Sequence, residues 1–256
     1  MRKLSGNSFI FIIFIAIMIY NSLTSGRFSD PRQWLIDTLI RLPAIIIGLT
    51  FHEFMHAFTA YKLGDQTPYG QGRVTLNPVK HIDPVGIIAL IFIGFGWGRP
   101  VMVNPYAFRK NPRLANLLVD VAGVFINFII ALVFMLVLLL VYKDILVVAA
   151  AYPDIPFINL LFLISPGPLY TILLYIIYIN LVLMLFNLLP IPPLDGFGIL
   201  TEIFNLRRFS WYRPFYNNGS ILLLVLIIFG GVGFVLGPGI NGMIGFIGKL
   251  WIAVLT

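Results

Sequence analysis

Long apolar runs constrain this chain more than any other feature of its sequence. The three clearest, residues 34–63, 114–142 and 170–189, each reach the roughly 20 residues that a helix needs to cross a bilayer. Hydrophobic residues make up 59% of the 256 residues and charged residues only 11%, which excludes a soluble globule and a disordered chain. The absence of cysteine excludes thiol chemistry and disulfides. We therefore predict an all-α polytopic membrane protein.

Shorter apolar runs extend this prediction to about six transmembrane helices in a single membrane domain, residues 1–256. Residues 1–33 read as an N-terminal anchor helix and loop, although a signal peptide also fits the run at 9–23. The catalytic core is expected at about 35–200, and the spans at 221–236 and 240–255 form a C-terminal helix pair within 201–256.

Between the second and third spans the sequence predicts two smaller features. Residues 85–95 are too short to span and end in a glycine-broken stretch, which is typical of a re-entrant loop. Residues 73–77 and 101–104 are short β-type runs, which predict a β-hairpin whose edge could accept a substrate strand.

Basic residues give the orientation, because Lys and Arg collect on cytoplasmic loops. With a cytoplasmic N-terminus, the outer side holds three of them, namely Arg27, Arg32 and Lys143. The cytoplasmic side holds twelve, namely Arg2, Lys3, Lys62, Arg73, Lys80, Arg99, Arg109, Lys110, Arg113, Arg207, Arg208 and Arg213. This asymmetry predicts that both termini are cytoplasmic. The net charge of +7 therefore needs no nucleic-acid partner.

The most specific motif is His52-Glu53-Phe54-Met55-His56, an H-E-x-x-H pattern inside the second span. Residues four apart share a helix face, so both imidazoles can reach one metal while Glu53 lies beside it. Ionisable groups inside a span are costly and face a cavity, a partner or an ion. We therefore predict a metal site rather than a solvated helix face.

A catalytic zinc site usually has three protein ligands, so a further one is needed. Among the remaining acidic and histidine residues, only Asp195 directly follows the end of an apolar span, in the proline-rich segment 187–196. His81 is expected to be a surface histidine. The other candidates are Asp30, Asp37, Asp65, Asp83, Asp120, Asp144, Asp154 and Glu202.

His52-Glu53-x-x-His56 and Asn187-x-x-Pro190-x-Pro192-Pro193-Leu194-Asp195-Gly196 together resemble the site-2 protease family of intramembrane zinc metalloproteases. Residues 72–78, 100–105 and 122–127 resemble further parts of that family, with Val124 in place of a proline. The chain resembles a minimal member, without PDZ or CBS domains.

The resemblance implies one Zn²⁺ per chain on His52, His56 and Asp195, with Glu53 as the general base and Asn187 near the scissile carbonyl. Asn187 could donate to the developing oxyanion or instead make a helix–helix hydrogen bond. The implied partners are a transmembrane protein or peptide substrate, the lipid bilayer and a regulatory membrane protein. The active site is expected toward the cytoplasmic side.

Two alternatives stay open at this stage. A non-proteolytic membrane metal-binding or transport protein could use the same ligands, but it has no need of Glu53. A membrane peptidase that takes a glutamate as its third ligand would have to use Glu202, the only other glutamate.

Overall fold

The computed structural model describes residues 6–26, 28–93, 96–109, 111–152, 154–164 and 166–255. Four of its helices are long and apolar enough to cross a membrane, namely α2 (Pro31–Lys62), α6 (Pro112–Val141), α9 (Pro168–Asn187) and α12 (Gly231–Leu255). These helices agree with a helical, multi-pass membrane protein.

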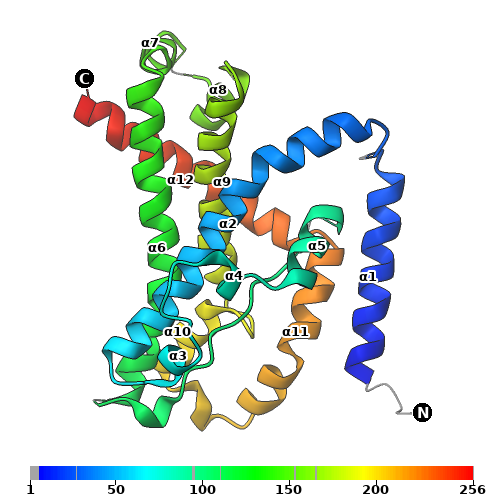
Figure 1. The fold of residues 1–256 in the computed structure, drawn as a ribbon, viewed down its shortest axis with the longest axis vertical. Helices are drawn as coiled ribbons and strands as arrows, with labels where there is room; N and C mark the ends of the chain where they lie inside the picture. Colours follow the sequence, from blue (N-terminus) through cyan, green and yellow to red (C-terminus); the bar gives the residue numbers. More distant parts are fainter. Residues whose placement is uncertain are drawn as a thin grey trace.

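The remaining elements are shorter (Figure 1). They are the helices α1 (Gly6–Thr24), α3 (Thr67–Gly70), α4 (Pro78–His81), α5 (Pro84–Ile93), α7 (Asp144–Ala151), α8 (Phe157–Ile164), α10 (Asp195–Phe204) and α11 (Tyr212–Ile228), and the 3-10 turns η1 (Pro105–Ala107) and η2 (Leu206–Arg208).

Local sequence explains where the central helices begin. Asp30 and Asn111 each precede a proline, and their side chains accept hydrogen bonds from the backbone N–H groups of Gln33 and Arg113. An N-cap acceptor followed by proline at the first helical position satisfies one free N–H and removes another, so it favours a helix start. These caps account for the starts of α2 at Pro31 and α6 at Pro112.

The core lies where α2, α6 and α9 pack together, and α12 covers it (Figure 1). Ala44 of α2 packs with Ile130 of α6 and Ile176 of α9, and all three are buried. The larger cluster between α6, α9 and α12 includes Met135 and Ile244, both fully buried. This helix bundle holds the site residues in fixed positions.

The C-terminal helix pair begins and ends at different residues from those predicted. The expected span 221–236 is interrupted, because α11 ends at Ile228 and α12 begins at Gly231. Gly230 lies between them with φ +72°, a left-handed conformation that terminates helices and is open to glycine. Pro238 then lies inside α12, where the sequence predicted a break between helices.

The direction of α12 also disagrees with the predicted topology. Gly239 packs on Leu185 near the end of α9, whereas Gly248 packs on Phe157 of α8. The Trp251 indole N–H donates to the Leu132 carbonyl at 2.9 Å. The end of α12 at Leu255 therefore lies at the end of the bundle that carries α7 and α8, away from α10 (Figure 1). Six spans with both termini on one side are not confirmed.

The predicted β-hairpin is not confirmed either, because the described residues contain no strand and only one isolated antiparallel bridge, Ile82 to Gly98. Carboxylates take the N–H groups that a ladder would use, since Val101 donates to Glu53 and Asn104 to Asp65. The predicted re-entrant segment forms the ten-residue helix α5, and its end at residues 94–95 lies outside the described residues.

Candidate metal centre

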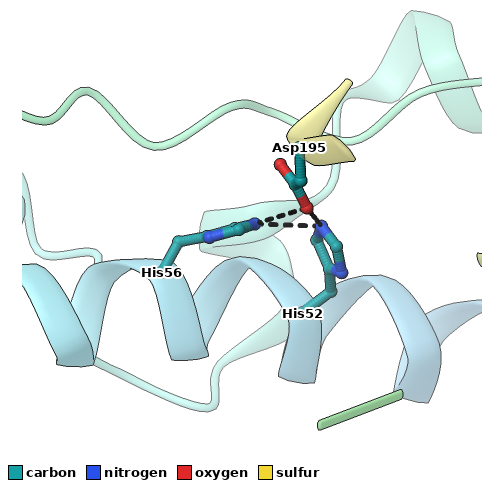
Figure 2. Close-up of side chains that lie close together, drawn as sticks. All are labelled: His52, His56 and Asp195. Carbon is teal, nitrogen blue, oxygen red and sulfur yellow. Dashed lines mark hydrogen bonds and ion pairs between the residues drawn. The ribbon is translucent and has the colours of Figure 1, made fainter. Parts of the chain in front are cut away.

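Three potential ligand atoms converge where α2 meets the start of α10 (Figure 2). The Nε2 atoms of His52 and His56 lie 3.0 Å apart. The Oδ2 atom of Asp195 lies 3.2 Å from the first of these nitrogens and 3.3 Å from the second. Among the described residues, this trio is the one His/Asp/Glu group whose ligand atoms could hold a single metal ion.

The spacing and burial of these atoms fit zinc. Ligands about 2.0–2.1 Å from a tetrahedral zinc lie about 3.3–3.4 Å from one another, close to the observed separations. His52 and His56 are only 5% and 8% exposed. Asp195 Oδ2 is buried and has no hydrogen-bond partner among the described residues. A buried carboxylate oxygen without a donor calls for a cation, and two ring nitrogens share its pocket.

Hydrogen bonds on the far side of each ring turn both Nε2 atoms toward Asp195. His56 Nδ1 lies 2.7 Å from the Val119 carbonyl, which can only accept, so this nitrogen carries the proton. His52 Nδ1 lies 2.7 Å from Asn127 Oδ1. Asn127 uses its amide N–H groups on the carbonyl of Gly48 and on Asn180, so its oxygen accepts from His52. Both Nε2 lone pairs are therefore available to a metal.

The absence of a side chain at Gly123 of α6 makes room for the two rings. A Cβ there would overlap His56 Nε2 and would lie 2.8 Å from His52 Cε1. Only glycine permits α6 to approach the H-E-x-x-H face this closely.

Asp195 reaches the histidines because the chain unwinds after α9 and then starts α10. Segment 188–194 contains three prolines, which lack the backbone N–H needed to continue a helix. Glu202, farther along α10, then ties this helix to α6. It accepts from the Asn116 amide at 3.1 Å and pairs with Arg207 at 2.5 Å, and Arg113 donates to its carbonyl. Glu202 is thus a structural anchor outside the metal group.

Glu53 lies beside the trio and is held through one oxygen. Its Oε2 accepts the Val101 N–H at 3.1 Å and lies 3.6 Å from Arg73 Nη2. Arg73 is itself buried and donates to the Arg99 carbonyl. Burial lowers the pKa of Arg73, and the Glu53 carboxylate acts in the opposite direction.

The structure brings four of the five predicted site residues together and leaves Asn187 apart. The Asn187 amide donates to the Leu183 carbonyl of its own helix at 3.0 Å. Among the described residues, no hydrogen bond joins Asn187 to His52, His56 or Asp195. The prediction that His81 lies on the surface is wrong, because His81 is fully buried and its Nε2 donates to the Thr75 carbonyl at 2.6 Å. Burial lowers the pKa of His81.

Sequence reasoning assigned no role to Asn127 or Arg73. For Asn127 a signal existed, since a buried amide inside an apolar span usually has a specific partner. For Arg73 there was none, because a loop arginine gives no sign of which carboxylate it will meet.

Comparison with known proteins finds relatives named as zinc metalloproteases. Residues 41–230 match peptidase family M50. YwhC of Bacillus subtilis, whose name assigns it provisionally to the zinc metalloproteases, is 40% identical over 212 residues, covering 82% of this chain and 90% of YwhC. Rip2 of Mycolicibacterium smegmatis, similarly named, is 27% identical over 86% of this chain and 79% of its own length. MJ0611 of Methanocaldococcus jannaschii, also so named, is 30% identical over 68% of this chain and 75% of its own length. No solved structure matches.

Proposed function

The chain belongs to peptidase family M50 and is a zinc metalloprotease, and from this premise we propose that it cleaves transmembrane proteins within or near the bilayer. The observation that carries the proposal is the position of His52, Glu53 and His56 in a helix long and apolar enough to span. Asp195, at the start of α10, converges on the two imidazoles. A peptide bond that reaches this trio must come from a segment that enters the helix bundle.

We assign His52, His56 and Asp195 as the zinc ligands. When bound there, zinc supplies Lewis acidity, which polarises a carbonyl and makes water easier to deprotonate. Asn127 and the Val119 carbonyl keep the two imidazoles in the tautomer that can bind a metal. This hydrogen-bonded support fixes ring orientation before substrate arrives.

We assign Glu53 as the general base. It takes one proton from the attacking water as the new C–O bond forms at the scissile carbonyl. It then gives this proton to the amine nitrogen as the C–N bond breaks. Both interactions that anchor Glu53 use Oε2, so Oε1 is the atom assigned to carry the proton.

We further propose that the end of the bundle bearing α3, α4 and α10 faces the cytoplasm. The cytoplasmic excess of Lys and Arg supports this orientation, since Lys62, Lys80, Arg99, Arg207 and Arg208 all belong to segments at this end. Substrates would then be cut near their cytoplasmic ends. The catalytic core is proposed to lie within about residues 35–200.

A reconstituted cleavage assay tests the activity. Purified chain in liposomes should cut a membrane-spanning peptide into two products whose masses differ from the intact peptide by one water in total. Removal of zinc with a chelator should stop the cleavage, and added zinc should restore it. Cleavage of soluble unfolded peptides only, with no cut in any membrane-spanning peptide, would contradict the intramembrane proposal.

Asn187 is proposed as an oxyanion donor through the second N–H of its amide, since one N–H already bonds the Leu183 carbonyl. Catalytic hydrogen bonds often form only in the substrate complex. Asn187→Ala should keep its zinc and lose about 10²–10³ in turnover, the usual effect of removing one oxyanion donor. Turnover per zinc-loaded enzyme, measured with thermal stability, checks this. Unchanged turnover with lowered stability would show that Asn187 only supports its helix.

A further inference from the structure

A basic cavity lies next to Glu53. It has a volume of about 430 Å³ and is lined by Gln71, Arg73, Lys80, Arg99, Pro100 and Met102. Three of these six side chains are cations and none is acidic. Because like charges in one cavity repel unless an anion joins them, this lining favours a negatively charged occupant.

Arg73 connects the cavity to the catalytic carboxylate. Its side chain is 5% exposed and lies 3.6 Å from Glu53 Oε2. One terminal nitrogen donates to the Arg99 carbonyl. Its Nε is buried and has no hydrogen-bond partner among the described residues. A buried N–H donor without an acceptor is unfavourable, so the guanidinium gains from an incoming oxygen.

The two exposed cations reach the same cavity through local backbone pairing. The isolated bridge joins Ile82 to Gly98, and the next residue, Arg99, donates its N–H to the His81 carbonyl at 2.7 Å. This pairing brings Arg99 beside α4, which carries Lys80. Buried His81 and its bond to the Thr75 carbonyl hold α4 in place.

We propose that this cavity is a subsite for the carboxylate of an Asp or Glu side chain in the substrate. The proposal rests on the proposed peptidase function. Since Arg73 contacts the residue assigned to the proton at the scissile bond, the acidic residue must lie close to that bond. Residues of an extended peptide are about 3.3 Å apart, which places it within about three positions of the cleaved bond.

The cavity suits a peptide carboxylate better than a lipid phosphate. The cavity adjoins the base that acts on the peptide, and a guanidinium can receive a carboxylate through two parallel N–H bonds. Exposed Lys80 and Arg99 add long-range attraction for the acidic residue as it approaches.

The test compares isosteric substrates. Membrane-spanning peptides carry Asp or Asn, and Glu or Gln, at each of three positions on either side of the cleaved bond. At one position the acid should raise kcat/KM about tenfold over its amide, the effect expected of one charge-assisted hydrogen bond. Most of this preference should arise in KM. Lys80→Gln and Arg99→Gln should each reduce it, and Arg99→Glu should favour a Lys at that position.

Arg208→Gln is the matched control, because Arg208 is also an exposed cation but lies over the Phe209 ring and is not one of the residues that line the cavity. It should keep the full preference for the acid. Cleavage of acid and amide peptides at equal rates, or a preference that survives in Lys80→Gln and Arg99→Gln, would overturn the subsite while leaving the peptidase function intact. Failure to cut any of the peptides would instead contradict the proposed function.

A lipid headgroup is distinguished by repeating the assay in neutral liposomes and in liposomes that contain phosphatidylglycerol. The subsite proposal expects the Asp-over-Asn preference in both. If Lys80→Gln and Arg99→Gln alter cleavage only in the anionic liposomes, whatever the peptide charge, the cavity binds lipid phosphate and the proposal is wrong.

Discussion

Glu53→Gln should lower turnover by a factor of about 10⁴ or more. General-base catalysis usually contributes a factor of about 10²–10⁴, and we expect the upper end because the carboxylate also orients the water. An amide cannot accept the proton of the attacking water, yet it has nearly the same shape as the carboxylate. Its oxygen can still accept the Val101 N–H, and Glu53 is not one of the three converging ligands. The variant should therefore retain about one zinc per chain.

The same substitution should also lower the stability of the fold. Arg73 loses its ion-pair partner while it stays buried, and an unsatisfied buried group costs about 1–3 kcal/mol in the free energy of unfolding. Turnover, zinc content and thermal unfolding of the one variant separate the catalytic loss from the structural one.

Asp37→Asn is the matched control, because it makes the same carboxylate-to-amide change on α2, far from the site. Among the described residues, the Asp37 side chain accepts a hydrogen bond only from Gln33, one turn away. The Asp37→Asn variant should keep turnover within a factor of about two of the unsubstituted protein, because surface substitutions rarely change the free energy of unfolding by more than about 0.5 kcal/mol. Substantial turnover in Glu53→Gln would refute the hydrolytic mechanism and favour a metal carrier that needs no base.

Asp195→Ala should lose most of its zinc and, with it, its activity. The substitution leaves two nitrogen ligands where a catalytic zinc site usually has three protein ligands. Loss of a group that only supports a ligand already lowers metal affinity about 10- to 100-fold, so loss of a ligand should lower it by more than about 100-fold. Metal analysis of the purified chain measures this directly.

Asp120→Asn tests whether the effect is specific to Asp195. Asp120 lies on α6 where α10 passes at Gly198, and a Cβ at Gly198 would lie 2.8 Å from its Cγ. It is outside the group that could hold the ion, so its removal should leave one zinc per chain. Full zinc in Asp195→Ala, or loss in Asp120→Asn, would reassign the third ligand.

The sequence alone determined the features that depend on local geometry. The H-E-x-x-H spacing placed His52 and His56 on one face of a helix because residues four apart are neighbours there. Apolar run length gave α2, α6 and α9 within a few residues, since backbone groups in lipid must bond within their own helix. The prolines after Asn187 correctly predicted an unwound segment that leads to Asp195.

Tertiary structure decided everything that depends on which distant groups meet. Asp195 follows His56 by 139 residues, and only the packing of α10 on α6, anchored by Glu202, brings its carboxylate to the histidines. The predicted hairpin is not confirmed in the described residues, where the carboxylates of Glu53 and Asp65 accept the N–H groups of Val101 and Asn104. The end of α12 lies beside α8, where Gly248 packs against Phe157. Local rules set helix length and face, whereas partners far apart in sequence are chosen by close packing and by the need to satisfy buried polar groups.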